Sequence, residues 1–327
     1  ANLTPEYKKA ELEFRAAATT EEKIAALEHM MAVIPKHKGT EKMQADLKKR
    51  ISKFREQAEK SGGKRGDLYF VRAEGAGQVI LLGPPNSGKS SLMRRLTNAR
   101  PEVGEYPFTT TKPFPGMMEY EDIKIQLVDL GPAADGELEP FHKNLARTAD
   151  LTLLVVDFGA ADPALDTKQI IDALARSKTE LVRTLPEEVP EYGVKPRPAL
   201  IALNKYDIDE DDILLGEFRA AVGDALDILP ISCADGRGVE ELRRAIFSAL
   251  DIIRVYSKIP GKPPDMASPF IMRRGGTLMD FARQVHKEFA EGLRYARIWG
   301  TNKELFDGQM VQRDYKLSDK DVIELHV

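Results

Sequence analysis

The sequence predicts an α/β protein: a central domain with a mainly parallel sheet, preceded by a small helical region and followed by a small α+β module. From residue 67 onward, short apolar runs alternate with amphipathic helical patterns, which is typical of a parallel sheet covered by helices on both faces. The residues before this point repeat apolar side chains at helical spacing, and stretches rich in Gly and Pro separate the parts. We therefore expect three units, at residues 1–65, 66–258 and 259–327.

The 327 residues have the composition of a soluble globular protein, with 42% apolar and 31% charged residues. No apolar run in the sequence approaches the roughly 20 residues that span a bilayer, so no membrane association is expected. Cys233 is the only cysteine, which rules out an intrachain disulfide and favours a reducing compartment. We expect a cytoplasmic protein.

The N-terminal residues 4–60 are expected to form three helices with thin apolar stripes, which make either a small bundle or a helical hairpin that needs a partner surface. Residues 1–65 hold 15 Lys/Arg and 10 Asp/Glu, a net charge of +5, in a chain whose net charge is −4. Two interpretations stay open for this basic arm: it contacts nucleic acid, or its charges only solvate a helical surface.

The central and C-terminal patterns define individual elements. The expected strands of the central domain are Val79–Leu82, Ile123–Val128, Leu151–Val156, Ala199–Leu203 and Asp227–Ile231. Its expected helices are Ser90–Thr97, Glu139–Thr148, Asp166–Val182, Glu210–Val222 and Val239–Leu250. After a linker at Ile259–Ser268, we expect strand, helix and strands at Pro269–Met272, Leu278–Phe289, Ala296–Trp299 and Val322–Val327. In such sheets, ligands bind at the carboxyl ends of the strands.

A phosphate-binding loop is predicted at Gly83–Ser90, which reads Gly-Pro-Pro-Asn-Ser-Gly-Lys-Ser and matches G-x-x-x-x-G-K-[ST]. The loop must wrap backbone N–H groups around phosphate oxygens, and glycines avoid side chains that would obstruct it. Lys89 would bring a positive charge to the β- and γ-phosphates, and the Ser90 hydroxyl can bind Mg²⁺. The candidate nucleotide-binding residues here are Gly83, Asn86, Ser87, Gly88, Lys89, Ser90 and Ser91, with Lys89 also a catalytic candidate.

A guanine-reading motif is predicted at Asn204-Lys205-Tyr206-Asp207, directly after an expected buried strand. The Asp207 carboxylate can accept two hydrogen bonds from the ring N–H and the exocyclic amine of guanine, a pair that adenine cannot offer. Asn204 and Lys205 would hold the neighbouring loop and cover the base. The competing interpretation is an ATP-dependent phosphotransferase that uses the same phosphate loop, and Asp207 argues against it.

Taken in order, these motifs and three further segments resemble the Obg/DRG group of translation-factor-related GTPases. The segments are Gly83–Ser90, Phe108-Thr109-Thr110, Asp129, Asn204–Asp207 and Ser232-Cys233-Ala234. Near the C-terminus, Ala296–Gly300 and Phe306–Gln309 resemble the TGS domain, a ubiquitin-like β-grasp module. The resemblance covers about residues 67–327, and the N-terminal helices are similar to those of DRG proteins more loosely.

The resemblance implies roles at the matching positions. Thr110 would be the switch threonine that closes over Mg²⁺ and the γ-phosphate, and it is the second catalytic candidate, while Phe108 and Thr109 would contact the nucleotide. Asp129 would hold a water molecule bound to Mg²⁺. The backbone N–H groups of Ser232, Cys233 and Ala234 would contact the guanine O6.

Two further expectations come from the resemblance. In K⁺-stimulated relatives the residue at the Asn86 position helps to hold a K⁺ ion beside the phosphates, where it stabilises developing charge. The alternative is that Asn86 only stabilises the loop. The N-terminal helices and the TGS domain would engage a ribosome or RNA, so we expect a regulatory GTPase that hydrolyses GTP to GDP.

The chain departs from the family pattern where the second switch begins. The family has Asp-x-Pro-Gly, whereas this chain reads Asp129-Leu130-Gly131-Pro132. The family glycine donates its N–H to the γ-phosphate, and proline has no N–H. We therefore expect slow intrinsic hydrolysis and weak discrimination between GTP and GDP. The alternative is a degenerate nucleotide-binding scaffold with little hydrolysis.

Overall fold

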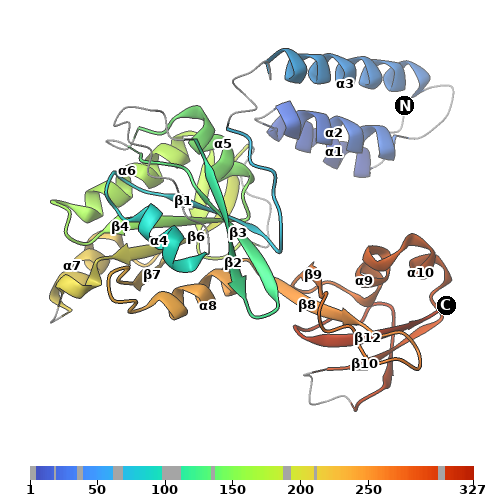
Figure 1. Ribbon diagram of the computed structural model, residues 1–327. Coiled ribbons are helices and arrows are strands. Elements are labelled where there is room, and N and C mark those ends of the chain that lie inside the picture. Colours follow the sequence, from blue (N-terminus) through green and yellow to red (C-terminus); the bar gives the residue numbers. More distant parts are fainter. Residues whose placement is uncertain are drawn as a thin grey trace.

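The structure is a computed structural model, and it describes residues 5–17, 20–34, 40–61, 69–97, 112–133, 137–186, 193–209, 212–300 and 306–327. A helical region, a central α/β domain and a C-terminal domain follow one another along the chain (Figure 1). Within these residues, every helix is too short or too polar to cross a bilayer.

The N-terminal region is a bundle of three helices, as expected. They are α1 (Pro5–Ala16), α2 (Thr20–Val33) and α3 (Glu41–Ser61). Their shared core contains Tyr7, Ala10, Leu27, Met30, Ile34 and Leu47. The bundle contacts the central domain through Glu22 of α2, whose carboxylate lies 2.8 Å from Lys195 Nζ and 3.3 Å from Arg147 Nε. The basic arm is therefore attached to the central domain at this point.

The central domain is built on a seven-stranded sheet. Its strands are β1 (Gln78–Leu82), β2 (Phe114–Tyr120), β3 (Ile123–Asp129), β4 (Leu151–Asp157), β5 (Thr179–Val182), β6 (Lys195–Asn204) and β7 (Asp227–Pro230). The order is β2-β3-β1-β4-β6-β5, with β7 also paired to β6, and only the edge strand β2 is antiparallel to its neighbour. The expected mainly parallel sheet is confirmed.

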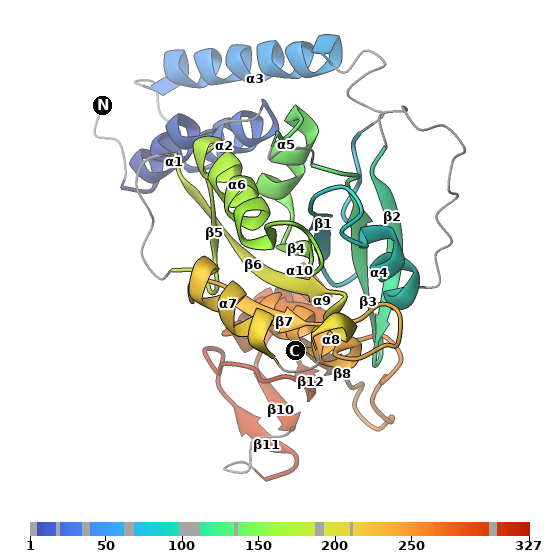
Figure 2. The ribbon, with the colours of Figure 1, turned by 90° about the vertical axis from the view of Figure 1, so that its left-hand side faces the viewer.

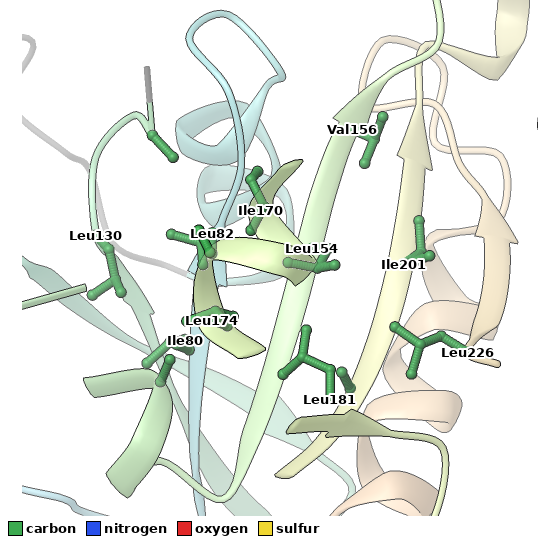
Figure 3. Close-up of a cluster of buried hydrophobic side chains, with 14 of the residues drawn as sticks. Ile80, Leu82, Leu130, Leu154, Val156, Ile170, Leu174, Leu181, Ile201 and Leu226 are labelled. Atoms are coloured by element: carbon green, nitrogen blue, oxygen red, sulfur yellow. The ribbon is translucent and has the colours of Figure 1, made fainter. Parts of the chain in front are cut away.

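Helices cover both faces of this sheet (Figure 2). The helices are α4 (Lys89–Leu96), α5 (Pro140–Thr148), α6 (Pro163–Arg176), α7 (Ile213–Val222) and α8 (Val239–Ala249). Strand residues alternate between two cores: Ile80 and Leu82 of β1 pack toward α5, α6 and α7, whereas Val79 and Leu81 pack toward α4 and α8. Figure 3 shows the first core, where Leu154 of β4 lies near Ile80 and Leu82. Burial on both faces explains the continuous apolar runs.

Two strands of this sheet were not predicted. The helix expected at Asp166–Val182 ends at Arg176, because Lys178 adopts a left-handed φ of 60° and the chain then continues as β5. The sequence of β2, Phe114–Tyr120, contains Pro115 and Gly116, which obscure its strand pattern. Proline is tolerated there because β2 lies at the sheet edge.

The C-terminal domain has a five-stranded sheet in the order β11-β10-β12-β8-β9. Its elements are β8 (Ile252–Ser257), β9 (Phe270–Arg273), α9 (Leu278–Val285), α10 (Lys287–Gly292), β10 (Tyr295–Trp299), β11 (Gln309–Val311) and β12 (Asp321–His326). The sheet therefore starts before the expected boundary at Ile259, and Ile259–Ser268 connects two of its strands rather than two domains. The single helix expected at Leu278–Phe289 is two helices, because His286 is extended, with φ −170° and ψ 147°.

A buried arginine joins the two sheets. Arg254 of β8 is 2% exposed and its guanidinium lies 2.5 Å from Glu121, 2.8 Å from Asp122 and 2.7 Å from Asp319. Glu121 and Asp122 form the turn between β2 and β3, and the Tyr256 hydroxyl donates to Asp122 as well. The guanidinium holds the pKa of Asp319, a partly buried carboxyl, below its usual range despite burial. The hairpin of the central sheet is thus tied to the C-terminal sheet.

Replacing this guanidinium should destabilise the protein strongly. In Arg254→Met, three carboxylates lose their buried partner, and we expect a loss of about 3–5 kcal/mol in unfolding free energy, measured by urea denaturation. The matched control is Arg274→Met, which removes an exposed ion pair with Asp251 and should cost about 1 kcal/mol or less. Equal losses in the two variants would contradict the assigned role of Arg254.

Candidate nucleotide-binding site

The candidate residues gather at the carboxyl ends of the parallel strands. The loop Gly83–Ser90 follows β1, Asp129 ends β3, Asn204 ends β6, and the Ser232–Ala234 segment follows β7. Strands that run in one direction bring these ends to one edge of the sheet. Residues that are far apart in sequence therefore meet there, as the motif order predicted.

The phosphate loop is held closed around the Lys89 ammonium. Lys89 Nζ donates to Gly83 O and Pro84 O, both at 2.8 Å, and to Ser87 Oγ at 3.3 Å. Burial lowers the pKa of Lys89 to about 8, although the Asp129 carboxylate opposes this shift. A phosphate placed beside this ammonium would stabilise its charged form.

Two oxygen ligands suited to Mg²⁺ lie together at the start of α4. The Ser90 hydroxyl donates to Asp129 Oδ2 at 2.8 Å, and the other oxygen of Asp129 accepts from the Gly131 N–H at 3.0 Å. A hydroxyl and a carboxylate are hard ligands of the kind that Mg²⁺ prefers, and nucleotide phosphates usually complete such a site. The donor set therefore fits the ion.

The Asn204 side chain connects the phosphate loop to the segment Ser232–Ala234, which is called the guanine loop below. Its Nδ2 donates to Ser87 O at 3.0 Å, and its Oδ1 accepts from the Cys233 N–H at 3.1 Å. The approach is so close that a Cβ on Gly88 would lie 2.1 Å from Asn204 Nδ2. Gly88 also has a φ of 93°, which favours glycine. Glycine is thus required at position 88 by the close approach of Asn204, as well as by the wrapping of the loop around phosphate that the motif predicts.

The guanine motif is held from two sides. Ser232 Oγ donates to Asp207 Oδ1 at 2.6 Å, which orients the carboxylate through one of its two oxygens. Lys205, at a left-handed φ of 67°, places its ammonium 2.5 Å from Asp157 Oδ2. Burial raises the pKa of the Cys233 thiol to about 11, so the thiol is protonated at neutral pH. Of the three backbone N–H groups expected to contact the guanine O6, those of Ser232 and Cys233 already donate within the protein, to Arg237 O at 2.9 Å and to Asn204 Oδ1 at 3.1 Å.

The start of the second switch is occupied by internal bonds. The Ala133 N–H donates to Gly83 O at 3.0 Å, and Gly131 has a φ of 76°. Leu130 O accepts from the buried His142 Nε2 at 3.0 Å, so this nitrogen carries the proton, and burial lowers the pKa of His142. Pro132 has no N–H to contribute. The N–H groups on both sides of Pro132 are therefore engaged within the protein.

The remaining expected residues have different outcomes. Phe108, Thr109 and Thr110 lie outside the described residues. Asn86 is exposed, with a left-handed φ of 61°, and Ser91 Oγ accepts from Arg94 at 3.4 Å. This hydrogen bond lies within α4 and does not connect Ser91 to another part of the site.

Comparisons with known proteins agree with this geometry. Residues 78–205 match the family described as 50S ribosome-binding GTPase, and residues 253–327 match the TGS domain. A GTP-binding protein of Methanocaldococcus jannaschii is 30% identical over 93% of this chain and 92% of its own length. Developmentally-regulated G-protein 1 of Arabidopsis thaliana is 28% identical over 93% of this chain and 90% of its own. The chain belongs to the DRG-like GTP-binding proteins.

A further relative of this DRG-like chain is Ribosome-interacting GTPase 1 of Saccharomyces cerevisiae, 27% identical over 94% of this chain and 99% of its own length. The resemblance to DRG proteins and to the TGS domain is thereby confirmed. The fold is a P-loop GTPase domain with a mostly parallel sheet, followed by a separate TGS domain.

Sequence reasoning missed two residues of the DRG-like site. Asp157 ends β4, and its position directly after a buried apolar run could have indicated it. Arg95 lies in the last turn of α4 and donates to the carbonyl oxygens of Cys233 and Ala234. An arginine late in a helix has no comparable sequence signal, because its partners lie nearly 140 residues away.

Adding a methyl group at Gly88 tests the packing at the centre of the site. In Gly88→Ala, the clash with Asn204 and the left-handed φ should cost about 1–3 kcal/mol, seen as a lower midpoint of thermal unfolding. The control is Gly216→Ala within α7, where an added Cβ meets nothing within 4 Å. That substitution should be neutral or stabilising by up to about 1 kcal/mol. An unchanged midpoint for Gly88→Ala would refute the close approach.

Proposed function

We propose that this DRG-like protein binds GTP and GDP with Mg²⁺ at the described site and hydrolyses GTP slowly. The observation that carries the proposal is the Asn204 bridge, because one side chain fixes both the phosphate loop and the guanine loop. Binding of the two ends of one nucleotide requires that these loops keep a constant separation.

At the phosphate end, Lys89 and the backbone N–H groups of Gly83–Ser90 would bind the β- and γ-phosphates. The lysine would exchange its carbonyl partners in the loop for phosphate oxygens, which favours its charged form. Ser90 would bind Mg²⁺ directly, Asp129 through a water molecule, and Thr110 when the first switch closes. The ion neutralises charge that develops on the phosphates during transfer.

At the base end, Asp207 would accept hydrogen bonds from the guanine N–H groups, and Ser232 keeps its carboxylate oriented. Lys205 would lie along the base, held by Asp157. The Ala234 N–H would bind the guanine O6. Adenine would leave the Asp207 carboxylate without donors, and an unpaired charge of this kind is strongly unfavourable.

Slow hydrolysis is supported by the second switch. The sequence continues from Pro132 with Ala133 and Ala134, so no glutamine at these positions can orient an attacking water. The bond from Ala133 N–H to Gly83 O would have to break before this N–H could reach a γ-phosphate. The same observations favour the alternative of a nucleotide-binding scaffold that hardly hydrolyses GTP.

The partner we propose is a ribosomal particle or RNA, reached through the N-terminal helices and the TGS domain. This proposal draws on the printed names of the matched family and of the yeast relative. It also draws on the net charge of +5 in residues 1–65, since exposed lysines such as Lys48, Lys49 and Lys53 of α3 can contact phosphate groups. The corresponding location is the cytoplasm.

Single-turnover hydrolysis of GTP by the purified full chain tests the proposed activity. With Mg²⁺ in Na⁺ buffer, we expect a rate on the order of 10⁻⁴ to 10⁻³ per second, as for GTPases that lack a supplied catalytic group. If Asn86 holds K⁺ beside the phosphates, K⁺ buffer should raise the rate roughly tenfold or more.

The control for the cation is Asn86→Ala, which should lose the K⁺ response and keep the rate in Na⁺. Equal rates in Na⁺ and K⁺ would assign Asn86 to loop stability alone. Fast turnover in Na⁺ would contradict the account of the second switch, and no turnover in either buffer would favour the scaffold.

A further inference from the structure

Arg95 connects the helix that follows the phosphate loop to the loop that would read the base. Its Nε and Nη2 donate to Cys233 O at 3.2 and 3.0 Å, and Nη2 also donates to Ala234 O at 2.7 Å. The planar guanidinium can serve two neighbouring carbonyls at once, which a lysine ammonium cannot do with the same fixed geometry. Two successive peptide groups of the guanine loop are therefore held by one side chain.

Because a peptide group is planar, the contact of Arg95 with the Cys233 carbonyl also fixes the direction of the Ala234 N–H. The Cys233 carbonyl and the Ala234 N–H belong to the same planar trans peptide group, so they point in opposite directions. When Arg95 holds the carbonyl oxygen, the Ala234 N–H must point away from α4. Among the residues that the structure describes, this N–H donates to no acceptor. It is thus oriented and available for a ligand.

The charge of Arg95 also strengthens the same N–H as a donor. A cation at the carbonyl oxygen polarises the peptide group, and hydrogen bonds in such a chain reinforce one another. The preceding N–H, that of Cys233, is engaged by Asn204 Oδ1 at 3.1 Å. The loop is therefore fixed on one side by Asn204 and on the other by Arg95, with the Ala234 N–H between these supports.

The end of α4 is itself anchored. Arg243 of α8 donates to Arg95 O at 3.3 Å and to Glu119 O of β2 at 3.0 Å. This contact fixes the backbone from which the Arg95 side chain extends.

We propose that Arg95 is a positioning residue for purine recognition, which aims the Ala234 N–H at the O6 of guanine. Through it, the helix of the phosphate loop sets the selectivity of the site for 6-oxopurines. This inference rests on the proposed function, because it needs guanine nucleotides to bind with the base against the Ser232–Ala234 loop.

The test compares nucleotides that differ at single atoms of the base. GDP and IDP share O6, IDP lacks the 2-amino group that Asp207 would bind, and 6-thio-GDP replaces O6 with a larger sulfur that accepts hydrogen bonds weakly. Dissociation constants for all three, and for ADP, are measured on the wild-type chain and on Arg95→Met. The matched control is Arg94→Met, because the neighbouring Arg94 is also exposed and, among the residues that the structure describes, donates to Ser91 of its own helix alone.

In Arg95→Met, we expect GDP and IDP to weaken by the same factor of about ten, since both lose the aimed N–H. The affinity for 6-thio-GDP should fall less, so that the ratio of GDP to 6-thio-GDP affinity shrinks toward one. The ratio of GDP to IDP affinity, which measures the contribution of the contact between Asp207 and the 2-amino group, should not change. Arg95→Lys should lie between these limits, and Arg94→Met should match the wild type.

An equal loss for GDP and 6-thio-GDP would overturn the inference and leave Arg95 with a general structural role. Wild-type affinity for GDP in Arg95→Met would overturn it as well. Failure of the wild-type chain to prefer GDP over ADP is a different result, because it would contradict the proposed function itself.

Discussion

The site depends on the two hydrogen bonds of the Asn204 side chain. One amide spans the gap between the phosphate loop and the guanine loop, so the distance between the two nucleotide-binding regions is set by a single residue at the end of a buried strand. Gly88 leaves room for that amide, and no other residue could do so at its backbone conformation without strain. The sheet holds the strand ends, and Asn204 holds the loops that leave them.

A second constraint links this site to the C-terminal domain. The strand β3 carries Asp129 at one end and the Arg254-bound turn at the other, so a displacement of this strand would move both Asp129 and the turn. The buried Arg254 pairs with three partly exposed carboxylates, which makes separation of the two sheets at this point costly. The geometry therefore provides a physical route between Asp129, a proposed Mg²⁺-binding residue, and the TGS domain.

Much of this arrangement could be predicted from sequence because its parts are local. The run Val79–Leu82 followed by the glycine-bracketed loop specifies strand, turn and helix within a few residues. Asp207 could be assigned to guanine recognition from its residue type and its position after a buried strand. The strand β2 was missed because Pro115 and Gly116 are acceptable only at an edge, which is a property of the whole sheet. Arg95 was missed because its contacts depend on tertiary folding. The membership of β8 in the C-terminal sheet was missed for the same reason, because it too depends on tertiary folding.

The central claim is that the site selects guanine through the Asp207 carboxylate, and a change of base preference tests it most directly. In Asp207→Asn, the carboxamide can pair with xanthine, so we predict that GDP affinity falls roughly 100-fold or more while XDP binds better than GDP. Asp235→Asn, in the neighbouring loop and paired with Arg237, is the control and should keep the wild-type preference. Unchanged GDP affinity in Asp207→Asn would contradict the account.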